Sequence, residues 1–198
     1  MILWINGAFG SGKTTVAFEL NRRIKNSFVY DPENIGYFIR RNTPFGSGDF
    51  QDFELWREFN YKMLKFISDG YDGLIIAPMT ITSPLYFDEI IGRLQNDGVD
   101  VRHFILMADR ETLLNRLRFR ELRSRLNMKE NWAVKQIDRC INAFEKDIDG
   151  IKIDTVNKSI DSVVNEIGRT AGVSLLRDKR TGVGKALHRA ATLMRHIR

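Results

Sequence analysis

The sequence predicts an α/β protein with an open, five-stranded parallel sheet flanked by helices. Two observations carry this prediction. Short apolar runs alternate with longer stretches of helical periodicity from the N-terminus to about residue 170. Between the first apolar run and the first helical stretch lies a glycine-rich loop that fills the phosphate-binding pattern G-x-x-x-x-G-K-[ST], Gly7-Ala8-Phe9-Gly10-Ser11-Gly12-Lys13-Thr14. Strand, glycine loop and helix in this order predict a P-loop NTPase fold.

The elements around the glycine loop follow from its flanks. Residues 1–5 form a short apolar run that suits a buried parallel strand. Residues 15–25 predict a helix, because their apolar residues recur at a spacing of four, at Val16, Leu20 and Ile24. The second strand, residues 27–30, is expected to end at Asp31-Pro32, since proline cannot continue the hydrogen-bonded ladder.

The rest of the chain continues the alternation. Residues 42–52 are expected to form a loop, and residues 53–68 an apolar-rich helix. The three remaining strands are expected at residues 73–78, 101–107 and 151–155. The remaining helices are expected at residues 85–95, 110–123, 132–144 and 160–170. In such a sheet, ligands bind at the C-terminal ends of the strands.

The residues of the glycine loop have distinct expected roles. The glycines give the backbone a tight path, so that its N–H groups can approach phosphates. Lys13 can reach the β- and γ-phosphates, and the Thr14 hydroxyl can hold Mg²⁺. The helix from Thr15 directs its N-terminal N–H groups at the same phosphates. The sequence therefore predicts a site for ATP and Mg²⁺, with nucleotide contacts from Gly7, Ala8, Phe9, Gly10, Ser11, Gly12, Lys13, Thr14 and Thr15.

Asp31 is the candidate catalytic residue outside the loop. It follows the second strand, at the edge of the sheet where the glycine loop also lies. Its carboxylate could accept a proton from a substrate hydroxyl or orient a Mg²⁺-bound water, so Asp31 is also a candidate metal ligand. The alternative is an Asp that initiates a turn before Pro32 and has no catalytic role.

Two departures from common patterns narrow the class of protein. The third strand leads into Thr80, whereas motor ATPases and GTPases have a Mg²⁺-supporting Asp at this strand end. Thr80 could bind a phosphate or substrate, and the missing Asp favours a small kinase of the nucleoside- or shikimate-kinase type. After the fifth strand, Asn157-Lys158 begin a near match to the guanine-reading pattern N-K-x-D, but the acid comes one residue late, at Asp161. ATP is therefore favoured, with Asn157 as a candidate nucleotide contact.

Arginines crowd the end of the helix after the fourth strand, at Arg116, Arg118, Arg120, Arg123 and Arg125. Arg116 and Arg120 are four residues apart and share a face. A lid over residues 115–130, closing arginines onto the transferring phosphoryl group, would explain the cluster and makes these two arginines catalytic candidates. The alternative is a solvated basic helix face. Weaker candidates for holding the phosphate acceptor are Arg40, Arg41 and Arg57.

The net charge of +6 belongs to the C-terminal tail. Residues 177–198 hold seven Lys or Arg and one acid, Asp178, so residues 1–176 carry no formal net charge. This distribution argues against a nucleic-acid-binding NTPase. The expected division is a P-loop kinase-like domain over residues 1–176 and a basic amphipathic helix over residues 177–198.

Plotted at about 100° per residue, the tail separates into an apolar arc and a basic side. The arc contains Val183, Ala186, Leu187, Ala190, Met194 and Ile197. Such a helix can lie on an anionic membrane surface, weakly and reversibly because its apolar arc lacks Trp and Phe. The alternative is a helix docked on its own domain or on a partner.

The remaining composition indicates a cytoplasmic protein of ordinary domain size, with 198 residues. No run approaches the roughly 20 apolar residues of a membrane span. The glycine loop begins too close to Met1 for a signal peptide. Cys140, the single cysteine, lies among apolar residues at helical spacing and is expected in the core, and the three histidines lack metal-site spacing.

Seven segments together resemble the bacterial tunicamycin-resistance ATP-binding proteins, the TmrB family: WINGAFGSGKT, FVYDPE, LWREFNY, PMTI, YFDEIIGRL, LMADRETLLNRLRFR and NWAVKQIDRC. The resemblance runs from Met1 to about Arg198. It implies a P-loop kinase-like fold, ATP binding at Gly7–Thr14 and protection against tunicamycin, a nucleoside antibiotic with a long acyl chain. It also implies peripheral membrane attachment through a C-terminal amphipathic helix, on the inner face of the cell membrane.

Two functions stay open. The first is a kinase that moves the γ-phosphoryl group of ATP to a hydroxyl of tunicamycin or a related nucleoside sugar. In it, Asp31 would be the base, Thr14 would hold Mg²⁺, and Lys13 and the arginines would stabilise charge. The second is a non-catalytic binder, in which ATP orders the site and the protein sequesters the drug. Asp31 and the arginine cluster favour the first function, whereas Thr80 keeps the second open.

Overall fold

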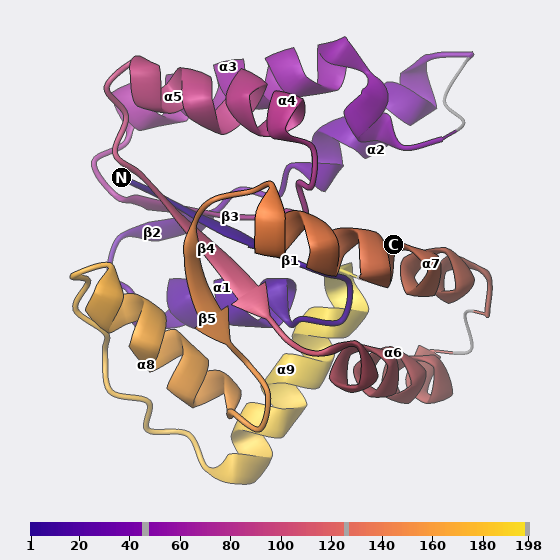
Figure 1. Ribbon diagram of the computed structural model, residues 1–198. Helices are drawn as coiled ribbons and strands as arrows, with labels where there is room; N and C mark the ends of the chain where they lie inside the picture. Colours follow the sequence, from indigo (N-terminus) through magenta and orange to yellow (C-terminus); the bar gives the residue numbers. More distant parts are fainter. Residues whose placement is uncertain (45–47, 125–126, 197–198) are drawn as a thin grey trace.

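Five parallel strands form one sheet in the order β2-β3-β1-β4-β5 in the computed structural model (Figure 1). The strands are β1 (Ile2–Gly7), β2 (Ser27–Val29), β3 (Leu74–Pro78), β4 (Val101–Met107) and β5 (Ile151–Asp154). The structure describes residues 1–44, 48–124 and 127–196, and the side chains of these residues except 120–124, 127–131 and 193–196. The sheet confirms the predicted fold class.

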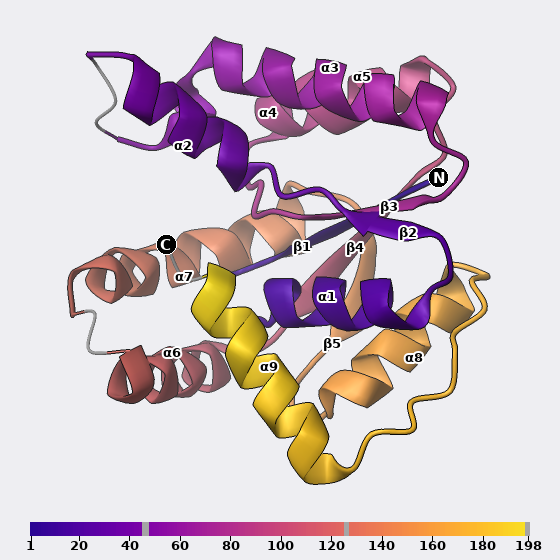
Figure 2. The same cartoon turned by 180° about the vertical axis from the view of Figure 1, so that it is seen from behind.

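Helices cover both faces of this sheet (Figures 1 and 2). One face carries α1 (Lys13–Arg23) and α8 (Ile160–Thr170), with α9 (Gly182–His196) outside α1. The other face carries α2 (Glu33–Asn42), η1 (Phe50–Asp52), α3 (Glu54–Gly70), α4 (Pro84–Phe87), η2 (Asp88–Gly92) and α5 (Arg93–Asn96). The pair α6 (Arg110–Ser124) and α7 (Asn127–Lys146) packs beside β4.

Strand β1 is fully buried at the centre of the sheet, because the alternation of its side chains supplies apolar groups to both faces. Leu3 and Ile5 belong to the core that α1 and α8 cover. Ile2 and Trp4 belong to the core beneath α3, η2 and α5. A third cluster joins β4 to α6 and α7 and includes the buried Cys140, whose pKa is raised by burial. The glycine loop therefore begins at the end of the central, fully buried strand of the sheet.

Three elements differ from the sequence expectation. Residues 33–42 form helix α2, although no helix was expected there. The helix expected over residues 85–95 consists of α4, the π-helical turn η2 and α5. The helix expected over residues 132–144 begins earlier, at Asn127, and ends at Lys146.

The C-terminal helix α9 docks on its own domain through its basic side. Lys185 and Arg189 lie 2.9 and 2.8 Å from the carboxylate oxygens of Asp161 on α8. Arg180, just before α9, pairs with Glu19 of α1 at 2.5 Å. The ion pairs turn the apolar side outward, with Val183 72% and Leu187 67% exposed. The alternative of docking on its own domain is thus observed, but cations make the contact.

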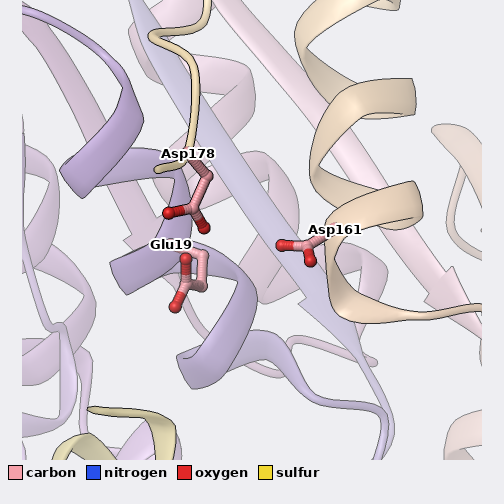
Figure 3. Close-up of side chains that lie close together, drawn as sticks. All are labelled: Glu19, Asp161 and Asp178. Atoms are coloured by element: carbon pink, nitrogen blue, oxygen red, sulfur yellow. The ribbon is translucent and has the colours of Figure 1, made fainter. Parts of the chain in front are cut away.

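Glu19, Asp161 and Asp178 lie together beneath this helix (Figure 3). Their oxygens are within 4.8 Å of one another, which is close enough for a metal site. Cations neutralise them instead, namely Arg22, Arg180, Lys185 and Arg189. The hydrogen bond from Arg180 holds the pKa of Asp178 well below its ordinary value. The cluster is therefore an ion-pair network that holds the tail.

Candidate functional site

The glycine loop joins the C-terminal end of β1 to the N-terminus of α1, as predicted. Gly7, Gly10 and Gly12 have φ of 146°, 85° and 98°, a region that side chains rarely allow. A Cβ on Gly7 would lie only 2.8 Å from the carbonyl oxygen of Leu106. The loop path therefore requires glycine, as the sequence pattern implied.

The loop has the features that suit a bound phosphate. Gly12 caps α1 without a side-chain hydrogen bond, and the first turn of α1 holds no acidic residue. Lys13 Nζ donates to the carbonyl oxygens of Gly7 at 2.9 Å and Ala8 at 3.1 Å, so its charge is held at the loop. The buried Ser11 hydroxyl finds no hydrogen-bond partner among the described residues. An uncapped helix N-terminus, an ammonium group and an unpaired hydroxyl fit an anionic ligand.

Asn6 anchors the loop, and sequence reasoning missed it. Its Oδ1 accepts hydrogen bonds from the backbone N–H of Gly7 at 2.8 Å and of Ile81 at 3.0 Å. Its Nδ2 donates to the Ile81 carbonyl at 2.9 Å and to His103 Nε2 at 3.2 Å. Asn6 is 0% exposed, so each bond is made away from water. One amide thus fixes the start of the loop to the segment after β3 and to β4.

His103 is held neutral in this network. Its Nδ1–H donates to the Asp149 carbonyl at 2.7 Å, which leaves Nε2 to accept from Asn6. Burial lowers the pKa of His103 to about 4. In the unfolded chain, with the ordinary pKa of about 6.5, the ring takes a proton first as the pH falls. Stability from this site is therefore complete above about pH 6.5 and is lost as the pH falls toward 4.

Thr80 supports the loop from the other side. Its buried hydroxyl donates to the Gly7 carbonyl at 2.9 Å. The same carbonyl accepts from Lys13, so strand β3 and helix α1 meet at one oxygen. Thr80 thus makes a structural bond to the loop, and its contact with phosphate or substrate stays a prediction.

Helices α6, α7 and α8 pack around the loop. A Cβ on Gly10 would lie 3.1 Å from the Leu113 carbonyl of α6. Phe9 stacks edge-on against Trp132 of α7, with ring centroids 5.0 Å apart. Because the loop contacts α6 and α7, a movement of these helices would change the position of the phosphate loop.

Arg116 of α6 is fixed to the segment after β5. Its Nη1 and Nη2 donate to Thr155, to Oγ1 at 3.0 Å and to the carbonyl oxygen at 2.7 Å. Burial lowers the pKa of this half-buried arginine. Asn157 follows in a turn, exposed and with φ of 55°. The structure thus brings together Arg116 and the segment of Asn157, both nucleotide-site candidates.

Of the other arginines in the cluster, Arg118 is exposed, and the rest lie in a part of the chain that the structure does not describe in full. The side chains of Arg120 and Arg123, and residue Arg125 altogether, are outside the described residues. The catalytic role of Arg120 and the lid over residues 115–130 therefore stay predictions.

Asp31 lies at the expected edge of the sheet but also begins a helix. Strand β3 separates β2 from β1, so Asp31 lies two strands away from the glycine loop. Its Oδ1 accepts from the Glu33 N–H at 3.0 Å, and its carbonyl accepts from the Asn34 N–H at 3.1 Å. The turn-forming role is thus present, and the roles as base and metal ligand stay predictions.

Side chains of α3 hold the backbone around Asp31. The Trp56 indole N–H donates to the Pro32 carbonyl at 3.0 Å. The Tyr30 hydroxyl donates to Asn60 Oδ1 at 2.8 Å, and both Trp56 and Asn60 are 0% exposed. The sequence predicts α3 as an apolar-rich helix. Asn60, a polar residue within it, was the signal that could have indicated the contact with Tyr30.

Of the weaker acceptor candidates, Arg57 and Arg40 have structural partners, and Arg41 is exposed. Arg57 is buried, contacts Glu89 through Nε and donates to the Gln51 carbonyl at 2.6 Å. Arg40 lies over the Phe50 ring, 5.0 Å from its centroid. These contacts tie the helices of this face together.

A hollow of about 540 Å³ opens at the ends of β4 and β5, beside α7. Acidic residues dominate its polar lining, at Asp109, Asp138, Glu145 and Asp154. No residue of the glycine loop lines it. Carboxylates repel phosphate, so we place the nucleotide at the glycine loop rather than in this hollow.

We expect Asn6→Ala to weaken MgATP binding by about tenfold or more, since it leaves the buried N–H groups of Gly7 and Ile81 unpaired, at about 1–3 kcal/mol each. Calorimetric titration with MgATP measures this effect. Asn60→Ala is the matched control, because Asn60 is equally buried but lies outside the loop. Both variants should lose stability in urea, and only Asn6→Ala should lose affinity. Equal affinities for the two variants would contradict the anchoring role of Asn6.

Comparisons with known proteins agree with this geometry. A sequence model of a family described as an AAA domain matches residues 2–146. The tunicamycin resistance protein of Deinococcus radiodurans is 31% identical, with 89% of this chain and 98% of that chain covered and a TM-score of 0.75. None of the curated proteins compared with the chain matches it.

Two solved structures of lower identity share the fold. A sugar kinase from Janibacter sp. is 17% identical, with coverage of 87% and 94% and a TM-score of 0.58. Shikimate kinase from Bacteroides thetaiotaomicron is also 17% identical, with coverage of 87% and 99% and a TM-score of 0.54. With the glycine loop, these findings support an ATP-binding, kinase-like protein. The chain belongs to the AAA domain family and to the tunicamycin-resistance proteins of P-loop kinase fold.

Proposed function

We propose that the protein is a small-molecule kinase that transfers the γ-phosphoryl group of ATP to a hydroxyl of tunicamycin or a related nucleoside sugar. The observation that carries this proposal is a phosphate loop with Lys13 at the start of α1, in a chain 31% identical to a tunicamycin resistance protein. The same site could serve sequestration, so the chemistry needs separate support.

The reaction needs no covalent intermediate with the protein, which contributes positioning and electrostatic stabilisation. The acceptor oxygen forms a bond to the γ-phosphorus, the bond to the bridging oxygen breaks, and ADP leaves with that electron pair. Asp31 accepts the proton of the acceptor hydroxyl. Lys13 and the N–H groups at the start of α1 stabilise the developing negative charge. Thr14 follows Lys13 in the first turn and would hold Mg²⁺, whose charge assists the same step.

Positioning of the two substrates falls to the elements around the loop. Arg116, which is held by Thr155 after β5, and the nearby segment of Asn157 would contact the nucleotide. Trp56 holds the backbone carbonyl of Pro32 and Asn60 holds the Tyr30 side chain, so both neighbours of Asp31 are fixed. A fixed base and fixed phosphates lower the entropic cost of bringing reactants together.

A non-catalytic binder is the second candidate, and a specific observation favours it. Strand β3 is followed by Thr80, whose hydroxyl donates a hydrogen bond to the Gly7 carbonyl, where motor ATPases and GTPases have an Asp that supports Mg²⁺. In this reading ATP orders the loop, and the protein retains intact drug.

Mass spectrometry of tunicamycin after incubation with protein and MgATP separates the two candidates. We expect the drug to gain one phosphoryl group. Asp31→Asn should lower kcat by about 10²–10⁴-fold, because the proton acceptor is lost. Glu33→Gln, two residues away, is the control and should retain kcat. Intact drug held by wild-type protein with bound ATP would instead establish sequestration.

We further propose that α9 attaches the protein to the inner face of the cell membrane, consistent with cytoplasmic synthesis and an acylated ligand. The outward side of α9 carries the exposed Val183 and Leu187. Its inward cations are already paired with Asp161, Glu19 and Asp178, so attraction to anionic lipid is weaker than the tail charge implies. Among the described residues, no helix has the length and hydropathy needed to cross a bilayer. Attachment would therefore be peripheral.

Sedimentation with vesicles that contain anionic lipid tests the attachment. Full-length protein should co-sediment, and a chain truncated after Asp178 should not. Leu187→Asp should reduce co-sedimentation with the ion pairs of α9 intact, whereas Leu176→Asp, an exposed leucine outside the helix, should not. Unchanged sedimentation of the truncated chain would remove the membrane proposal.

A further inference from the structure

Helix α3 carries an apolar stripe on its outer side. The stripe consists of Leu55, Phe59, Met63 and Phe66, which are 51%, 39%, 37% and 75% exposed. At about 100° per residue these four side chains fall within an arc of about 80°. These four apolar side chains form a continuous patch along about 16 Å of helix, unlike apolar residues that are scattered singly over a surface.

Other sides of α3 supply the contacts within the domain, which leaves the stripe uncovered. Trp56, Asn60 and Leu64 are buried beneath the helix. Another side faces α5, where the Tyr61 hydroxyl donates to Asp97 at 2.5 Å. In Figures 1 and 2, α3 forms an outer layer of the molecule on this face of the sheet.

We propose that the occupant of this stripe is the stripe of a second copy of the chain, with the two α3 helices packed antiparallel about a two-fold axis. The spacing of the stripe is nearly symmetric about the middle of the helix. Antiparallel packing therefore sets Leu55 against Phe66 of the second copy, and Phe59 against Met63 of the second copy. A two-fold interface requires such a self-complementary surface.

The charges beside the stripe agree with this arrangement. Glu58 and Lys62 border it on the same edge, where they pair with each other at 3.2 Å and Glu58 also pairs with Arg93; the Lys62 side chain is 69% exposed. A two-fold axis perpendicular to both helices places like edges together, so Lys62 of one copy meets Glu58 of the other. The wider border is balanced, with Lys65 and Asp69 paired at 2.5 Å. An anionic membrane would select a positive border instead, which α3 lacks.

This proposal is independent of the proposed function, because it rests on α3 alone and not on the phosphate loop. Sedimentation equilibrium of full-length protein over a range of concentrations tests it. Wild-type protein should dimerise, and Phe66→Glu should raise the dimer dissociation constant about tenfold or more. Phe119→Glu is the matched control, since Phe119 on α6 is 70% exposed, and it should dimerise as the wild type does.

Charge reversal tests the packing direction. Lys62→Glu should weaken the dimer, and the double variant Glu58→Lys with Lys62→Glu should restore it. Circular dichroism checks that each variant folds, and Phe59→Ser provides a second uncharged disruption of the stripe. A monomeric wild type, a dimer that neither Phe66→Glu nor Phe59→Ser weakens, or a loss confined to vesicle binding would each overturn the proposal.

Discussion

The hydrogen bonds of Asn6 join the phosphate loop to the sheet, and the rest of the site depends on them. Asn6 is the last side chain of β1 before Gly7, and its amide reaches Ile81 after β3 and His103 on β4. Three neighbouring strands thereby hold the position at which the glycine loop begins. The Gly7 carbonyl then receives Lys13 and Thr80, so the loop is fixed at both its amide and its carbonyl side. A loop that is already held in place can stabilise phosphate without reorganising when the phosphate binds.

The charged side of α9 holds the tail on the domain, and its apolar side stays exposed. The domain and its tail meet through an ion-pair network in which Glu19, nearly inaccessible to solvent, contacts Arg180. Burial of these groups is tolerated because each acid has cationic partners. The apolar side of α9 consequently faces outward, as does the stripe of α3.

Much of this structure was predictable from local patterns, because parallel strands and the glycine loop leave strong signals. The loop, its helix and the sheet class follow from residues that are adjacent in the sequence. Helix α2 was missed because Asp31-Pro32 signals a chain break, whereas here the helix begins directly after Pro32, and the Asp31 carboxylate accepts from its first N–H group, that of Glu33. Asn6 was missed because it reads as the polar end of an apolar run. A fully buried amide directly before a phosphate loop is the signal that could have found it.

Long-range contacts account for the remaining differences. The amphipathic pattern of α9 leaves a membrane surface and docking on the domain or a partner open, and it does not show that the cations of α9 pair with acids from α1 and α8 that are distant in sequence. The hydrogen bond from the Thr80 hydroxyl to the Gly7 carbonyl is visible only in the fold. A local sequence pattern cannot identify such partners, because they belong to strands and helices that are distant in the sequence.

Calorimetric titration of the wild type and of Lys13→Gln with MgATP tests the central claim, that this loop is a built nucleotide site. The wild type should bind one MgATP per chain. Lys13→Gln should bind about tenfold to a hundredfold more weakly, as expected for about 1.5–3 kcal/mol from a charge-assisted contact with phosphate. Absence of binding by the wild type, or equal affinity in the variant, would contradict the account.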